Sequence, residues 1–176
     1  MEPYKNPFIH YFCNMNIIAL LQKGKEEKKA NEKYLQWLKR KHPPKLDITI
    51  QHIHDVVFEK IDCLNCANCC KTTSPIFYPK DIERAAKALR MKAVDFEKNY
   101  LRIDEDKDFV LQNSPCPFLM EDNACSIYES RPTACREYPH TNRKNFVQIT
   151  ELTYKNTLVC PAVVKIVDEL KEVYHA

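Results

Sequence analysis

The chain has 176 residues, of which 44% are hydrophobic and 29% charged, so it is long and apolar enough to form one soluble domain with a buried core. Its net charge of +3 is small and its basic residues are interleaved with acidic ones, which disfavours nucleic acid as a partner. The single glycine, Gly24, excludes the glycine-rich phosphate loops of nucleotide-dependent enzymes and the nucleophile turn of serine hydrolases.

Helices are predicted for most of the first sixty residues. Hydrophobic periodicity predicts helix over residues 7–41, with Gly24 as a break or cap. The segment His42-Pro43-Pro44 ends this helix, because proline has no backbone N–H to donate. A second helical pattern begins with Asp47 as its N-cap and continues to Ile61, where the cysteines start.

Three more helices and one β element are predicted downstream. Pro79 begins one helix, residues 93–101 form a shorter one, and Pro161 begins the last, because proline is favoured at the first position of a helix. Residues 109–111 are predicted to be a short strand and residues 116–128 a small hairpin.

The sequence therefore predicts a mostly α protein, of the α+β kind with one small β-hairpin. Its compact helical domain is expected to be organised around a cysteine metal or cluster centre. Residues 1–60 are assigned to an N-terminal helical segment and residues 61–176 to a cysteine-cluster metal-binding domain. We expect these two parts to form one continuous globular unit.

Nine cysteines are many for this length, and they indicate either disulfides in an oxidising compartment or metal ligation in a reducing one. The N-terminal sequence MEPYKNPFIHYF does not have the pattern of a secretory signal peptide. The apolar run IIALL, residues 17–21, is too short to cross a bilayer. We therefore expect a cytoplasmic protein with no membrane partner, whose cysteines bind metal rather than one another.

Eight of the cysteines form the candidate metal site. They are Cys63, Cys66, Cys69, Cys70, Cys116, Cys125, Cys135 and Cys160. Two residues between cysteines let both sulfurs reach the same ion or cluster. Residues 63–69 contain three cysteines at this spacing, as in the segment with which bacterial ferredoxins bind an iron–sulfur cluster. In ferredoxins the fourth ligand is followed by proline, as Cys116 and Cys160 are here.

The ninth cysteine, Cys13, is far from the others in the sequence, and we expect it to be dispensable for metal binding.

The adjacent cysteines predict two sets of ligands. Neighbouring residues project their side chains in different directions, so Cys69 and Cys70 are not expected to bind one small ion together. One expected set is Cys63, Cys66, Cys69 and a Cys-Pro cysteine, preferably Cys160, and the other is Cys70, Cys116, Cys125 and Cys135. The triplet spacing favours an iron–sulfur cluster, preferably 4Fe-4S, whereas the division into four and four also suits zinc or iron ions.

The combined motifs CLNCANCCK, CPFL and CSIYESRPTACREYP, with a late Cys-Pro, resemble the CxxCxxCC cysteine-cluster family, whose members are described as zinc- or iron-chelating. The resemblance covers about residues 60–165, and flagellin lysine N-methylases share part of the pattern. It implies that the cysteines chelate metal, and it carries over Tyr128, Arg131, Pro132 and Arg136 as further motif residues.

Three basic residues are candidate cofactor-binding residues. Thiolate ligands give a metal or cluster site a negative charge, which N–H groups close to the sulfurs can offset. Lys71, Arg131 and Arg136 lie within a few residues of the cysteines and could donate such contacts. Arg131 could instead form a salt bridge with Glu129 or Glu137.

Three functional hypotheses follow. The first is a metal-binding protein with an iron–sulfur cluster or a zinc or iron site, acting in redox chemistry, in metal handling or as an accessory to an enzyme, with metal ions and a redox or protein partner. The second is a lysine N-methylase-like enzyme or subunit, although the chain has no recognisable S-adenosylmethionine loop. The third is a zinc-stabilised interaction module. No catalytic residue is identified, and among the histidines His140 is the candidate for an additional ligand.

Overall fold

The computed structural model describes residues 16–175. The elements in chain order are α1 (Ile17–Glu26), α2 (Lys28–Lys41), α3 (Leu46–Phe58), η1 (Cys63–Asn65), α4 (Asn68–Thr72), α5 (Pro79–Ala88), α6 (Ala93–Tyr100), β1 (Leu101–Ile103), β2 (Phe109–Leu111), η2 (Tyr128–Ser130), α7 (Thr133–Glu137), η3 (Phe146–Ile149), α8 (Thr150–Thr157) and α9 (Pro161–Val173). Cys13 and the beginning of the helix predicted over residues 7–41 lie outside the described residues.

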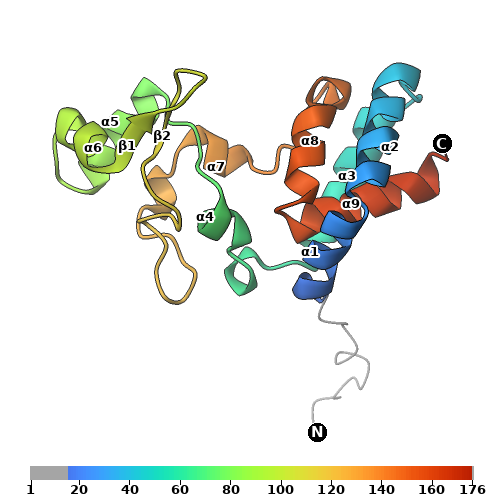
Figure 1. Ribbon diagram of the computed structural model, residues 1–176, viewed down its shortest axis with the longest axis horizontal. Helices are drawn as coiled ribbons and strands as arrows, with labels where there is room; N and C mark the ends of the chain where they lie inside the picture. Colours follow the sequence, from blue (N-terminus) through green and yellow to red (C-terminus); the bar gives the residue numbers. More distant parts are fainter. Residues whose placement is uncertain (1–15, 176) are drawn as a thin grey trace, which may run out of the picture.

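These elements form two lobes with a cysteine-rich middle (Figure 1). We call the first the helical lobe, built from α1, α2, α3, η3, α8 and α9, and the second the hairpin lobe, built from α5, α6, β1, β2 and the loops that follow β2. The extensive contacts between elements fall within one lobe or the other. The chain passes between the lobes twice, first through η1 and α4 and later through α7.

The helical lobe joins the two ends of the described chain in one core. Helices α1, α2 and α3 pack against α8 and α9, so residues from before position 60 and after position 145 are buried together. Leu35, Leu38, Ile50, Phe146 and Ile166 are among its fully buried side chains. Each such side chain contributes about 1.5–3 kcal/mol relative to an exposed one, so this lobe is stabilised without the cysteines.

The hairpin lobe has a separate, aromatic core. Strands β1 and β2 are antiparallel, with Leu101 opposite Leu111, and α6 packs on both α5 and β1. The ring of Phe96 lies 5.7 Å from that of Phe77 and 5.9 Å from that of Phe118, measured between centroids. Such aromatic pairs add to the stabilisation from burial, so this lobe also has its own hydrophobic core.

The predicted fold class is confirmed. Residues 16–175 are mostly helical with a small antiparallel hairpin, and α5 and α9 begin at Pro79 and Pro161 as predicted. None of the helices in this part of the chain is long and apolar enough to span a membrane.

The small hairpin lies earlier in the chain than predicted. It pairs residues 101–103 with residues 109–111, whereas residues 116–128 form a turn-rich loop in which Leu119 and Cys125 make an isolated β-bridge. Strand β1 was not predicted, because it follows α6 directly and a short apolar run at that point suits a helix and a strand equally.

Asp47 has a different role from the predicted helix cap. Lys45, in a left-handed conformation with φ of 61°, is the N-cap of α3, and Asp47 lies in the first turn. Its carboxylate accepts hydrogen bonds from the backbone N–H groups of Asn145 and Phe146, at 2.7 and 3.0 Å. Asp47 therefore anchors the chain segment that leads from α7 back into the helical lobe.

Gly24 is not the helix break either. The break between α1 and α2 falls at Glu27, and Gly24 is buried within α1. A Cβ atom at position 24 would collide with the carbonyl oxygen of Thr157 in α8 and lie 2.8 Å from Cγ2 of Val164 in α9. The single glycine is therefore required by the close approach of three helices rather than by a turn.

Gly24→Ala is expected to destabilise the protein by about 1–3 kcal/mol, because α1 must shift away from the backbone of α8 to accommodate the methyl group. Chemical denaturation monitored by circular dichroism measures this change. Lys25→Ala, at the exposed neighbouring position, is the matched control and should change stability by less than about 0.5 kcal/mol. Equal stability of both variants would contradict the packing described for Gly24.

Candidate metal centre

The first cysteines lie on a tight turn between the lobes. The carbonyl oxygen of Cys63 accepts hydrogen bonds from the backbone N–H groups of Cys66, at 3.1 Å, and Ala67, at 2.8 Å. Ala67 then adopts a left-handed conformation with φ of 48° and directs the chain into α4, which carries Cys69 and Cys70. This backbone path brings four cysteines into one short segment of the connection between the lobes.

One side of α4 is bound to the helical lobe beside Cys160. The side-chain amide of Asn68 donates to the carbonyl oxygen of Val159 at 2.7 Å. Cys160 follows directly and is the N-cap of α9.

Burial raises the pKa of Cys160 to about 11, and the neighbouring thiols of Cys63 and Cys66 act in the same direction. The largest causes that raise the pKa of Cys69 are its hydrogen bond with Cys70 and its burial. The thiols of Cys160 and Cys63 raise that pKa further. We call Cys63, Cys66, Cys69 and Cys160 the first thiol set.

The other side of α4 is bound to the hairpin lobe. The backbone N–H of Cys116 donates to the carbonyl oxygen of Cys70 at 2.8 Å. The β-bridge between Leu119 and Cys125 holds the next cysteine beside this turn. Burial raises the pKa of Cys135 to about 12, and the thiols of Cys70, Cys116 and Cys125 contribute further. We call Cys70, Cys116, Cys125 and Cys135 the second thiol set.

The two sets meet at Cys69 and Cys70. A hydrogen bond joins their side chains, and it raises the pKa of Cys69 and lowers that of Cys70. Lys71 also acts on Cys70, lowering its pKa. One cysteine of this pair therefore belongs to each set, although the two sulfurs are themselves neighbours.

Several sulfurs receive backbone hydrogen bonds that favour the thiolate. The N–H groups two and three residues further along the chain donate to the sulfurs of Cys116 and Cys160, and the N–H group two residues along donates to that of Cys125. Each of these contacts lowers the pKa of the cysteine, against the larger effect of burial. Cys160 also lies at a helix N-terminus, where a negative charge is stabilised.

Two buried hydrogen-bond donors lie beside the thiols without a partner. They are the hydroxyl group of Tyr138 and Nε of Arg131. Besides burial, the charges that raise the pKa of Tyr138 are those of all four cysteines of the first thiol set. The charge of Arg131 lowers the pKa of Cys125 and Cys135 in the second thiol set, and of Cys63 in the first. A buried donor without an acceptor is costly.

The predicted basic residues have three different environments. The guanidinium group of Arg131 stacks on the ring of Tyr128, with Cζ 3.6 Å from the centroid, and within residues 16–175 it has no carboxylate partner. Lys71 donates from Nζ to the carbonyl oxygen of Cys66 at 3.3 Å. The guanidinium group of Arg136 donates to the carbonyl oxygens of Arg131 and Glu129, so it stabilises the backbone of η2. Their contact with a bound metal centre stays a prediction.

All eight cysteines in the described residues are free thiols. In residues 16–175, no three Cys, His, Asp or Glu side chains are placed to hold one ion together, so the two thiol sets are groups of neighbours. Their chemistry nevertheless fits a zinc or iron ion or an iron–sulfur cluster, because these bind thiolate sulfur and are stabilised by N–H and O–H donors around it. The partly buried thiols, the backbone donors and the two unpartnered donors supply that chemistry.

No histidine of residues 16–175 belongs to a group of three side chains placed to hold an ion. Nδ1 of His140, the predicted additional ligand, is 3.6 Å from a carboxylate oxygen of Glu137. Nδ1 of His54 is 2.7 Å from the hydroxyl oxygen of Thr141, and its ring packs on Phe58 at 4.4 Å between centroids. His140 as a ligand therefore stays a prediction.

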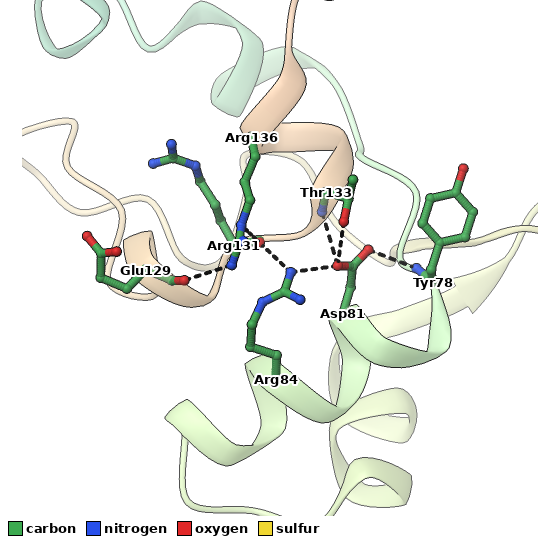
Figure 2. A network of polar contacts seen from close by, with 7 residues as sticks. All are labelled: Tyr78, Asp81, Arg84, Glu129, Arg131, Thr133 and Arg136. Atoms are coloured by element: carbon green, nitrogen blue, oxygen red, sulfur yellow. Dashed lines mark hydrogen bonds and ion pairs between the residues drawn. The ribbon is translucent and has the colours of Figure 1, made fainter.

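A buried carboxylate connects the hairpin lobe to α7 (Figure 2). Asp81 in α5 is only 1% exposed and accepts hydrogen bonds from the backbone N–H of Tyr78, at 3.2 Å, and from the N–H and hydroxyl of Thr133, at 3.1 and 3.0 Å. Nη2 of Arg84 donates to Asp81 at 2.6 Å and to the carbonyl oxygen of Arg131 at 2.8 Å. This network fixes the start of α7, which carries Cys135, against the hairpin lobe.

Sequence reasoning did not identify Asn68, Asp81 or Tyr138. Asn68 and Asp81 act through partners 91 and 52 residues away in the chain, which no local pattern indicates. Tyr138 did carry a signal, because it follows Cys135 within the motif CREYP, but its burial beside the first thiol set depends on the fold.

The fold and the site define a thiol-rich protein with two lobes, whose eight described cysteines are all free. Residues 62–161 match the model of the CxxCxxCC family, described as a "putative zinc- or iron-chelating domain". The match covers more than half of the chain, and the protein belongs to this family. Comparisons with curated proteins and with solved structures gave no match.

Asp81→Asn is expected to lower the free energy of unfolding by about 1–3 kcal/mol at neutral pH, because the half-buried Arg84 loses its ion pair and the new side-chain amide group faces hydrogen-bond donors. Although burial alone would raise the pKa of Asp81, the hydrogen bonds from Arg84, Tyr78 and Thr133 outweigh it and hold that pKa below 3.8. The stabilisation is therefore fully present above pH 3.8 and is lost as the pH falls through the lowered pKa.

Denaturant titrations of the wild-type protein and Asp81→Asn across this pH range measure the difference. The exposed Asp106→Asn, in the turn of the same lobe, is the control and should change stability by less than about 0.5 kcal/mol. If the difference in unfolding free energy between the wild-type protein and Asp81→Asn increased as the pH fell, the hydrogen bonds described for Asp81 would be contradicted.

Proposed function

We propose that this protein holds two cysteine-ligated metal centres side by side and acts through them in redox chemistry or metal handling. The observation that carries the proposal is that eight free thiols lie on and beside the connection between the lobes, with Cys69 and Cys70 adjacent on α4. Metal chelation is the property of the family, and the ligand assignment and the type of centre are our proposal.

The first thiol set is proposed to bind an iron–sulfur cluster, preferably 4Fe-4S. Three of its members have the spacing found in ferredoxins, and Cys160 supplies a distant ligand followed by proline. When bound, such a cluster supplies one-electron transfer. The hydroxyl group of Tyr138 would donate to a sulfur of this set, and such hydrogen bonds help to set the reduction potential of a cluster.

The second thiol set is proposed to bind a zinc or iron ion. Its members come from four separate positions in the chain, and four thiolates are ligands of compact zinc and iron sites. Arg131 would offset the negative charge of the thiolates from its position on the Tyr128 ring. A bound ion here would hold α4 and α7 to the hairpin lobe.

Placement in the cytoplasm and a redox or enzyme partner complete the proposal. A cytoplasmic environment keeps thiols reduced and available for metal. An exchange of electrons would require a partner that accepts or supplies them.

Anaerobically purified protein is expected to be brown, with broad absorption near ~400 nm and acid-labile sulfide. Cys66→Ala should abolish this absorption and the sulfide. Cys135→Ala should lower the metal content while leaving most of the absorption, because its thiol belongs to the other set. Cys13→Ala is the control and should retain both properties.

Metal analysis, sulfide assay and absorption spectra of the four proteins test the assignment. Colourless protein with about two zinc ions per chain would overturn the iron–sulfur cluster but not the ligand sets. Identical losses in Cys66→Ala and Cys135→Ala would overturn the division into two sets.

Removal of metal is expected to loosen the lobes from each other rather than unfold them. Each lobe has its own hydrophobic core, whereas the connection between them runs through the cysteine segments. Small-angle scattering after chelation under reducing conditions should give a radius of gyration larger by on the order of a tenth, with little loss of helical circular dichroism. An unchanged radius would show that the metal does not hold the lobes together.

A further inference from the structure

We infer that a basic groove beside the first thiol set binds a small anionic molecule carrying a carboxylate or phosphate group. The groove lies between α3 and the segment from α7 to η3, and its volume is about 760 Å³. This is within the range of small-molecule sites, which are typically about 300–1,000 Å³. Its lining residues include His54, Phe58, Arg136, Tyr138, Arg143 and Lys144.

The charges around the groove favour an anion. Arg136, Arg143 and Lys144 are cationic, and Glu137 is the one carboxylate among the lining residues. Within residues 16–175, the side chains of Arg143 and Lys144 form no ion pair, so their charges are not neutralised inside the protein. Arginine binds carboxylate and phosphate through paired N–H donors, and lysine adds a point charge.

Neutral donors and an aromatic surface complete the groove. Burial lowers the pKa of both His54 and His140, so at neutral pH their rings are uncharged groups that can donate or accept hydrogen bonds. Phe58 packs beneath His54 and presents an apolar surface. The groove thus combines apolar contact with a few polar groups, as ligand sites do.

The backbone that carries these cations is fixed at three points. Thr141 is fully buried and its hydroxyl oxygen is 2.7 Å from Nδ1 of His54. Asn156 donates its side-chain amide to the carbonyl oxygen of Pro139 at 3.2 Å. Asp47 accepts the two N–H groups at positions 145 and 146. Arg143 and Lys144 therefore project from an anchored loop, which lowers the entropy cost of binding.

Tyr138 separates the groove from the first thiol set. Its side chain lines the groove, and its buried hydroxyl group lies where the charges of Cys63, Cys66, Cys69 and Cys160 act on it. The groove itself is formed by the polypeptide alone, so the inference does not depend on which metal the thiols bind.

Titration of the reduced, metal-loaded full chain with inorganic phosphate and with citrate tests the inference. Two-dimensional NMR of the histidine rings is expected to show saturable shifts for His54 and His140 and none for His175, which lies outside the groove. Saturation by phosphate alone would indicate a phosphate ester as the ligand class, and saturation by citrate alone a carboxylate. Shifts of all three histidines to the same extent, or no saturation with either anion, would overturn it.

A pair of charge-reversal variants separates the groove from overall charge. Arg143→Glu with Lys144→Glu should weaken binding by about tenfold or more, because two attractive charges become repulsive. Lys28→Glu with Lys29→Glu, at exposed positions of α2, makes the same change in net charge and should leave the affinity unchanged. Equal affinity of the two variants, with their metal content and circular dichroism intact, would place the anion elsewhere.

Discussion

The neighbouring side chains of Cys69 and Cys70 are the contact on which the arrangement of this protein depends. They lie on α4, between two lobes that have separate cores and few contacts with each other. In addition to the hydrogen bond with Cys70 and to burial, the thiol of Cys160, at the start of α9 in the helical lobe, raises the pKa of Cys69. In addition to burial, Cys70 raises the pKa of Cys116 and Cys125 in the hairpin lobe. Any ligand of the thiols therefore also determines how the lobes are placed.

The thiols are surrounded by buried polar groups, and two of these groups have no hydrogen-bond partner. They are the Tyr138 hydroxyl and the Arg131 Nε, and burial also raises most of the cysteine pKa values. Binding of a cation to the sulfurs would remove their protons. The same change would break the hydrogen bond between Cys69 and Cys70, because that bond requires a thiol proton. Metal binding is thus coupled to local hydrogen bonding as well as to the position of the lobes.

The sequence predicted those features that depend on local chemistry. Pro79 and Pro161 mark helix starts because proline fixes φ, and the cysteine spacing indicates metal because nearby sulfurs must converge. Gly24 and Asp47 were misassigned because their roles arise from contacts with residues more than ninety positions away. Helix α8 was not predicted, since its packing against α2 rather than a strong apolar pattern stabilises it. Asp81 was missed because its partner Thr133 lies 52 residues further along the chain, and the burial of Tyr138 beside the thiols likewise depends on the fold.

The segment from α7 to η3 connects the two proposed sites through one stretch of backbone. It carries Tyr138, whose hydroxyl group faces the first thiol set, and Arg143 and Lys144, which line the groove. A centre ligated by four thiolates carries negative charge and would repel an anion placed beside it, an effect that is weak in water but substantial across a protein interior. The cations of the groove would offset this repulsion. An anion and a reduced centre would therefore influence each other's stability, because both interact with the same anchored segment.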